Sequence, residues 1–337
     1  MISEKAIGDL LSSMLPSGRL NPHFESDAEL IRLGDCRYLF TTDEFSAEDQ
    51  FREDDPYSLG WNIAVGGISD IFACGGVPLY YAHALTVGPR WDAEYLAQFG
   101  GGVREVLDAT GARFIGGDCG RSPLWRCTVS VIGSCAGAAV GRRGAAPGHR
   151  LYLSGPVGAG NFEAALTLGA AAAIPGAAAT KNRFALRGPV SALMKPFASA
   201  CLDTSDGVCA ALNTLADINQ CGYAVADLPY LETGLRFCEK AGWPRTLLFL
   251  GECGEYELLF TVPPDQEPAF LAEARKTGCH CCRLGQMTPA GRTLMEDGRE
   301  LDLASLHLQA RDYATPQRYL ADLVQWLERQ KPQAEKP

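Results

Sequence analysis

The alternation of apolar and polar positions divides the chain into short strands and longer helices. The aromatic and β-branched run at residues 37–42 is typical of a strand, which we expect to end at Asp43. Behind Pro56, apolar residues recur at helical spacing as far as Ala73, where Gly75 and Gly76 would stop a helix. The same reasoning predicts strands at 80–87, 114–115, 125–134, 151–154, 223–225 and 256–262, and helices at 57–73, 92–108, 162–173, 206–218, 264–276 and 319–329.

Two domains are expected, because 337 residues exceed the usual size of one. A break in the pattern at Ala145-Ala146-Pro147-Gly148 places them at 1–145 and 146–330, followed by a frayed tail at 331–337. Loop-forming residues dominate the first 35 positions, and residues 175–182 are expected to be a mobile stretch. Strands and helices alternate in both parts without a regular βαβ series, which predicts an α/β domain joined to an α+β domain.

Composition and charge narrow the function. The chain has 40 acidic and 30 basic residues, a net charge of −10, so it lacks the electrostatic footprint of a nucleic-acid partner. No apolar stretch is long enough for a membrane span, and Met1-Ile2-Ser3-Glu4-Lys5 does not begin an export signal. The 13 cysteines follow no framework pattern and are expected to be reduced thiols. We therefore expect a cytoplasmic protein with a small-molecule partner.

Aspartates at strand ends and glycine turns are the candidate chemistry. They lie in Thr41-Thr42-Asp43, Ser69-Asp70, Gly116-Gly117-Asp118 and Asp203-Thr204-Ser205-Asp206-Gly207, with Asp27 as a further member. Converging carboxylates repel one another unless cations lie between them, and Mg²⁺ prefers such oxygen ligands. The pattern favours Mg²⁺-dependent phosphoryl transfer. The alternative is structural, because aspartate often caps helices and turns, as Asp206 would before a helix.

The remaining sequence motifs do not indicate a specific cofactor or reaction. The chain has no Walker-type phosphate loop and lacks the protein-kinase signatures. The glycine-rich turn at residues 155–160 does not have dinucleotide-loop spacing. The run Cys279-His280-Cys281-Cys282 is too crowded for one tetrahedral zinc ion and has no second pair at finger spacing.

In their order along the chain, the aspartate motifs resemble those of the thiamine-monophosphate kinases. That family lies within the superfamily of aminoimidazole ribonucleotide synthetase and selenophosphate synthetase. The resemblance runs from about residue 25 to about residue 290. The motif around Ser69-Asp70 extends over residues 68–78. A fifth motif is the run Gly254-Glu255-Tyr256-Glu257-Leu258-Leu259-Phe260.

The resemblance implies a two-domain fold in which the N-terminal sheet joins a twin to form a barrel across a homodimer. ATP and Mg²⁺ would lie in the cleft between the domains, with Asp43 and Asp206 as candidate catalytic residues. Residues implied at ATP are Gly117, Asp118, Arg142 and Ser205. Gln50 and Glu255 would lie on the acceptor side. Implied metal or phosphate ligands are Asp27, Thr41, Thr42, Asp43, Asp70, Asp118, Asp203 and Asp206.

The positions at which this sequence differs from the thiamine-monophosphate kinases lie mainly on the acceptor side. Glu25-Ser26-Asp27 stands where the kinases usually carry Gly-Asp-Asp, and Gln50 stands at the position of their acceptor-binding histidine. The family's C-terminal aromatic motif is not recognisable, which leaves Tyr313 and Tyr319 as candidates for that role. The resemblance thus predicts phosphorylation of a small acceptor, with thiamine monophosphate giving thiamine diphosphate as the leading case.

Two alternatives stay open. A related ATP-dependent enzyme would activate another small substrate, but a selenophosphate synthetase would need a reactive N-terminal cysteine, and the first cysteine here is Cys36. Another member of the superfamily, the hydrogenase maturation protein that dehydrates a carbamoyl group, ends in a reactive cysteine. This chain ends in Glu335-Lys336-Pro337. The other alternative is a non-catalytic nucleotide-binding protein, suggested by the change at Ser26.

Overall fold

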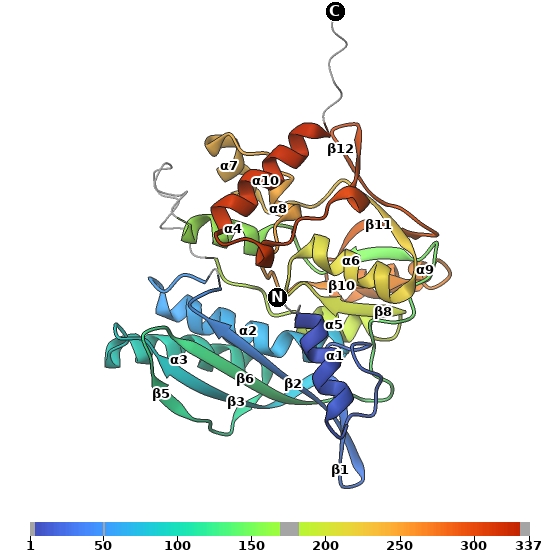
Figure 1. Ribbon diagram of the computed structural model, residues 1–337. Helices are drawn as coiled ribbons and strands as arrows, with labels where there is room; N and C mark the ends of the chain where they lie inside the picture. The colour runs from blue at the N-terminus through green and yellow to red at the C-terminus, as the bar shows by residue number, and fades with distance from the viewer. Residues whose placement is uncertain (1–3, 50, 169–181, 331–337) are drawn as a thin grey trace, which may run out of the picture.

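The computed structural model describes residues 4–49, 51–168 and 182–330. It shows two mixed α/β halves stacked on each other, with the N-terminal half in blue and teal and the C-terminal half in green to red (Figure 1). Within the described residues, no helix combines the length and the apolar character needed to cross a membrane.

The N-terminal half is an open six-stranded sheet with two long helices on one face (Figure 1). Its strands follow the order β1-β2-β6-β3-β4, and β5 pairs with β3 beside β4. The close crossing of the two helices depends on Gly102, where a Cβ atom would lie 2.0 Å from the Tyr57 carbonyl oxygen. The elements are α1 (Glu4–Met14), β1 (Glu29–Leu33), β2 (Cys36–Ser46), α2 (Pro56–Ala73), β3 (Val77–Val87), α3 (Ala93–Thr110), β4 (Arg113–Phe114), β5 (Cys119–Arg121) and β6 (Arg126–Ser134).

The C-terminal half is built on a seven-stranded sheet in the order β13-β12-β9-β11-β7-β10-β8. All neighbours in it are antiparallel except β9 and β12. Its elements are β7 (Arg150–Leu153), α4 (Ala159–Thr167), α5 (Gly188–Met194), β8 (Ala200–Asp203), α6 (Val208–Asn219), β9 (Gly222–Ala226), α7 (Glu232–Ala241), α8 (Leu247–Leu250), β10 (Leu258–Val262), α9 (Glu267–Thr277), β11 (Cys282–Thr288), β12 (Arg292–Glu296), β13 (Arg299–Asp302), η3 (Leu303–Ser305), η4 (Ala310–Asp312) and α10 (Pro316–Arg329).

Helix α2 joins the two halves. Its Asn62 side chain donates to the Asn182 carbonyl oxygen at 3.1 Å and accepts from the Phe184 amide at 2.9 Å. The Trp61 indole N–H donates to the Phe184 carbonyl oxygen at 2.7 Å. One buried cluster also contains residues of both halves, Ile68 and Phe260 among them. Paired polar groups and a shared core thus hold α2 against the C-terminal half.

Several sequence expectations were wrong in detail. The first 35 residues contain α1 and β1, and strand β2 continues past Asp43 to Ser46. Helix α6 begins at Val208 with Gly207 at its N-cap, so Asp206 does not cap it. The expected mobile stretch lies outside the described residues except for Asn182, and so does the tail at 331–337.

Candidate functional site

Two neighbouring cavities lie between the halves. The first, which we call the carboxylate cavity, has a volume of about 600 Å³ and is lined by most of the aspartates singled out above. The second, the apolar cavity, has a volume of about 980 Å³. Asp49, Ser205, Asp206 and Tyr256 line both cavities, so they mark the place where the two meet.

Four aspartates from distant segments form the floor of the carboxylate cavity. Asp27 precedes β1, Asp43 lies on β2, Asp70 on α2 and Asp203 ends β8. Carboxylate oxygens of Asp27, Asp70 and Asp203 lie within 4.8 Å of one another. We call these four residues the carboxylate cluster. The Thr41 hydroxyl donates to an Asp70 oxygen at 2.5 Å, which brings β2 against α2 at this point.

Burial makes the ionised cluster unfavourable. Desolvation, reinforced by the neighbouring carboxylates, raises the pKa of Asp43 to about 7. Desolvation also raises the pKa of Asp27 to about 7, although Arg142 opposes that shift. The pKa values of Asp70 and Asp203 are raised as well, with burial as the main cause. Like charges held this close need a cation or protons between them.

The donor set fits Mg²⁺. The cluster offers hard carboxylate oxygens from several directions, and Asp27 Oδ2 is buried without a hydrogen-bond partner among the described residues. The arrangement is specific to one place, because Asp27, Asp70 and Asp203 are the sole group of potential metal ligands found within the described ranges. The cysteine run at residues 279–282 is not part of that group.

Arg142 lies at the edge of the cluster. Its Nε donates to Asp27 Oδ1 at 2.7 Å, and its guanidinium also contacts that oxygen through Nη2. The guanidinium lies over the Phe24 ring, 4.7 Å from the centroid. The Arg142 guanidinium neutralises part of the cluster's charge and lines the carboxylate cavity.

The remaining expected ligands are divided between the cavity and other surfaces. Ser205 and Asp206 line the carboxylate cavity. Thr42 also borders it, but strand alternation directs its side chain to the face opposite Asp43, where its hydroxyl lies 3.1 Å from that of Ser130. Only its backbone therefore faces the cluster side of β2.

Gly117 and Asp118 lie apart from the cluster within one chain. Both are exposed, and neither belongs to the described lining of the carboxylate cavity. Asp43 is on β2, whereas Asp118 directly precedes β5, at the other end of the path β2-β6-β3-β5. Three strand spacings amount to about 14 Å, too far for one carboxylate to join the others.

The acceptor-side expectations need one correction. Glu255 is buried, with 1% of its surface exposed, and does not line the apolar cavity. Its carboxylate accepts from the amides of Gly158 at 2.7 Å and Ala159 at 3.0 Å, at the start of α4. Burial raises its pKa to about 8. Glu255 thus anchors the glycine-rich turn, and Gln50 lies outside the described residues.

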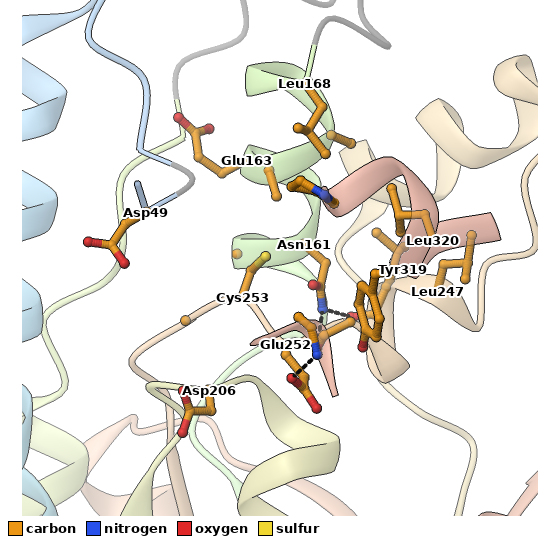
Figure 2. A pocket seen from close by; sticks show the side chains of 18 of the residues that line it. Asp49, Asn161, Glu163, Leu168, Asp206, Leu247, Glu252, Cys253, Tyr319 and Leu320 are labelled. Carbon is orange, nitrogen blue, oxygen red and sulfur yellow. Dashed lines mark hydrogen bonds between the residues drawn. The ribbon is translucent and has the colours of Figure 1, made fainter. Parts of the chain in front are cut away.

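The apolar cavity has aromatic walls and an acidic rim. Asp49, Glu163 and Asp206 lie along one side, facing Tyr319 and Leu320 (Figure 2). Both tyrosines proposed from the sequence line it, together with further aromatic residues that sequence reasoning did not single out: Phe51, Phe184, Phe237, Trp243 and Tyr256. Arg311 is the one basic residue in its described lining. This chemistry suits an aromatic ligand that carries positive charge.

Comparisons with known proteins agree with this geometry. Residues 25–139 match the family model for the AIR synthase related protein N-terminal domain, and residues 146–297 match its C-terminal domain. A thiamine-monophosphate kinase of Halobacterium salinarum is 30% identical over 254 residues, which cover 73% of this chain and 80% of that protein. The chain belongs to the thiamine-monophosphate kinase family. The Escherichia coli member is 28% identical over 302 residues, covering 82% of this chain and 88% of its own length.

Solved structures share the fold of this family member. AaThiL complexed with AMPPCP and TMP superimposes with a TM-score of 0.74 at 23% identity, covering 89% of this chain and 95% of the other. Hydrogenase maturation protein HypE in complex with ATP gives a TM-score of 0.65 at 19% identity, covering 90% and 95%. The sequence-based assignment to the family and to two mixed α/β domains is thereby confirmed.

Proposed function

We propose that the protein transfers the γ-phosphoryl group of ATP to thiamine monophosphate, forming thiamine diphosphate and ADP. The observation that carries the proposal is the contact between the two cavities at Asp49, Ser205, Asp206 and Tyr256. A metal-binding carboxylate cluster on one side and an aromatic, acidic cavity on the other suit a nucleotide and a cationic acceptor. The relatives named above carry this activity in their names.

Each half of the site has a distinct task in this proposal. Asp27, Asp43, Asp70 and Asp203, with Thr41 and Asp206, hold Mg²⁺, which neutralises phosphate charge when bound. Arg142 and Ser205 contact ATP from the wall of the carboxylate cavity. The aromatic walls hold the thiamine rings, whose thiazolium carries a positive charge that matches the acidic rim. Phosphoryl transfer needs positioning and charge neutralisation more than covalent chemistry.

Incubation with ATP, Mg²⁺ and thiamine monophosphate tests the function. We expect thiamine diphosphate and ADP in equal amounts by chromatography, and no product after EDTA treatment. Binding of Mg-ATP without turnover of thiamine monophosphate would instead favour another acceptor, which is the consequence expected if the change at Gln50 rebuilds the acceptor contacts. Failure to bind Mg-ATP at all would contradict the assignment of the carboxylate cavity.

A second copy of the chain completes the site in this proposal. The N-terminal sheet is open, and its strands expose the apolar residues Val77, Tyr80 and Phe114. Pairing two such sheets into a barrel would bury these residues and bring Asp118 of one copy toward the carboxylate cluster of the other. This accounts for the exposed position of Gly117 and Asp118.

We also propose that the domain boundary lies at residues 145/146 and that the protein is located in the cytoplasm.

Mixed dimers test the shared site. Asp43→Asn and Asp118→Asn proteins should each be inactive alone. When they are mixed and allowed to exchange subunits, half of the dimers are mixed and each of these regains one intact site. About a quarter of wild-type activity should therefore appear. Persistent inactivity of a mixture shown to exchange subunits would contradict the shared site, and mixing either variant with itself is the control.

A further inference from the structure

A buried ion pair crosses the cleft beside the apolar cavity. Arg52 Nε donates to Glu163 Oε1 at 2.6 Å, and the two side chains are only 8% and 5% exposed. Arg52 lies in the segment between β2 and α2 of the N-terminal half, whereas Glu163 lies on α4 of the C-terminal half. The partners are 111 residues apart in sequence. The pair thus connects the segment between β2 and α2 to helix α4, two parts of the chain that are far apart in sequence.

The segment held by Arg52 forms a partition between cavities. Asp49 lines the carboxylate cavity, the apolar cavity and a third cavity of about 380 Å³. Phe51 lines the apolar and third cavities, and its ring contacts those of Phe45 and Phe184, with centroids 5.8 and 6.2 Å away. Any shift of this segment would alter the wall of the apolar cavity and the place where the cavities meet.

Glu163, the other partner of the ion pair, is also part of a cavity wall. Glu163 is itself part of the apolar cavity's lining, and Figure 2 shows it on the same side as Asp49. Its second oxygen, Oε2, is buried without a hydrogen-bond partner among the described residues. Since a buried carboxylate depends on its partners, loss of Arg52 would leave Glu163 uncompensated, and the segment would lose its ion pair to α4 while keeping the contact between the Phe51 and Phe184 rings.

We propose that the Arg52–Glu163 pair is a positioning clamp for the phosphate acceptor, holding Asp49 and Phe51 against the apolar cavity. The clamp acts mainly on the acceptor, because neither Arg52 nor Glu163 lines the carboxylate cavity and Phe51 lines the apolar cavity, while Asp49 lies where the two cavities meet. This inference rests on the proposed function for its kinetic consequences. Its mechanical part, the tethering of Phe51 and Arg52 to α4, stands independently of the acceptor's identity.

Kinetic constants of four variants test the clamp. Arg52→Met and Glu163→Leu each remove one partner, the double variant removes both, and Glu163→Gln keeps an oxygen that accepts from Arg52. We expect the single losses to raise the KM for thiamine monophosphate roughly tenfold or more, with the KM for ATP within about twofold of wild type. Glu163→Gln should keep more of the acceptor affinity than Glu163→Leu, because its oxygen still accepts from Arg52 although the rim loses one negative charge. The exposed pair Arg104–Asp108 on α3 supplies the control Arg104→Met.

The double variant guards against misfolding, because replacing both ions avoids a buried unpaired charge. It should fold but keep the raised acceptor KM. Hydrogen exchange at the amides of residues 51–53 gives a readout without turnover, and we expect faster exchange in Arg52→Met and in the double variant than in Arg104→Met. Unchanged acceptor KM together with unchanged exchange would overturn the clamp. If the variants exchange faster but the wild-type protein does not phosphorylate thiamine monophosphate, the clamp stands and only the proposed function is overturned.

Discussion

An Asp43→Asn protein should lose at least about a thousandfold of its phosphoryl-transfer rate while its metal-free form remains as stable as the wild type or becomes more stable. The loss follows from the position of Asp43 in the carboxylate cluster, where Mg²⁺ would neutralise phosphate charge. A thousandfold corresponds to about 4 kcal/mol of transition-state stabilisation, which is within reach of a single removed electrostatic contact.

The stability half of this prediction has a separate cause. Asp43 is half-buried, and desolvation together with the neighbouring Asp203 and Asp27 carboxylates raises its pKa to about 7. An amide of the same shape carries no charge, so it removes repulsion among carboxylates that no metal ion separates. A residue whose main task was to hold the fold together would behave in the opposite way on replacement.

Urea unfolding in EDTA and steady-state rates with Mg-ATP measure the two halves. Asp108→Asn is a matched control, because this carboxylate lies on α3 and is 73% exposed. It should change neither quantity appreciably. Marked destabilisation of Asp43→Asn combined with retained turnover would show that Asp43 is a structural residue and that the metal assignment is wrong.

The sequence predicted those parts of the structure that depend on local pattern. Helix α2 was expected to start at residue 57 and end at Ala73, and it spans Pro56–Ala73, with Asp55 as its N-cap. Asp43, Asp70 and Asp203 were chosen because strand ends and an apolar helix placed them unusually, and they do converge. In contrast, α1 was missed although Ile7, Leu10 and Leu11 follow helical spacing, because the loop residues behind it dominated the reading.

Features that depend on tertiary structure could not be predicted. Glu255, Tyr256 and Glu257 are buried in succession, in the segment that leads into the fully buried strand β10, and Tyr256 has a left-handed backbone with φ of 55°. The acceptor-side placement of Glu255 rested on the resemblance alone, and no local pattern in the sequence indicates that this carboxylate binds the backbone amides of Gly158 and Ala159. The Arg52–Glu163 pair was likewise invisible, because neither residue has a neighbour in sequence that indicates its partner.

The metal-free protein should lose stability as the pH rises from about 4 to about 7, and Mg²⁺ should restore it most at the upper end. Asp27 and Asp43 have pKa values of about 7 in the folded chain, whereas an aspartate in an unfolded chain has a pKa of about 3.9. Between these values the folded state holds protons that the unfolded state has released. Stability is then fully present below pH 4 and falls as the pH approaches 7.

The magnitude makes the effect measurable. A difference of about three between folded and unfolded pKa corresponds to roughly 4 kcal/mol for one carboxyl group. Mg²⁺ competes with those protons for the same oxygens, so it should stabilise the protein little at pH 5 and strongly at pH 8. Ligand present at about 100 times its Kd adds roughly 2.7 kcal/mol for each site it occupies.

Urea unfolding at pH 5 and pH 8, with EDTA or with Mg²⁺, separates the cluster from other groups. Glu255 also has a raised pKa, of about 8, and contributes a loss of stability in the same direction. It is engaged by backbone amides, however, and its share should not respond to Mg²⁺. Asp43→Asn should flatten the pH dependence in EDTA and reduce the response to Mg²⁺ at pH 8. Equal Mg²⁺ stabilisation at both pH values would mean that the ion binds elsewhere than at the carboxylate cluster.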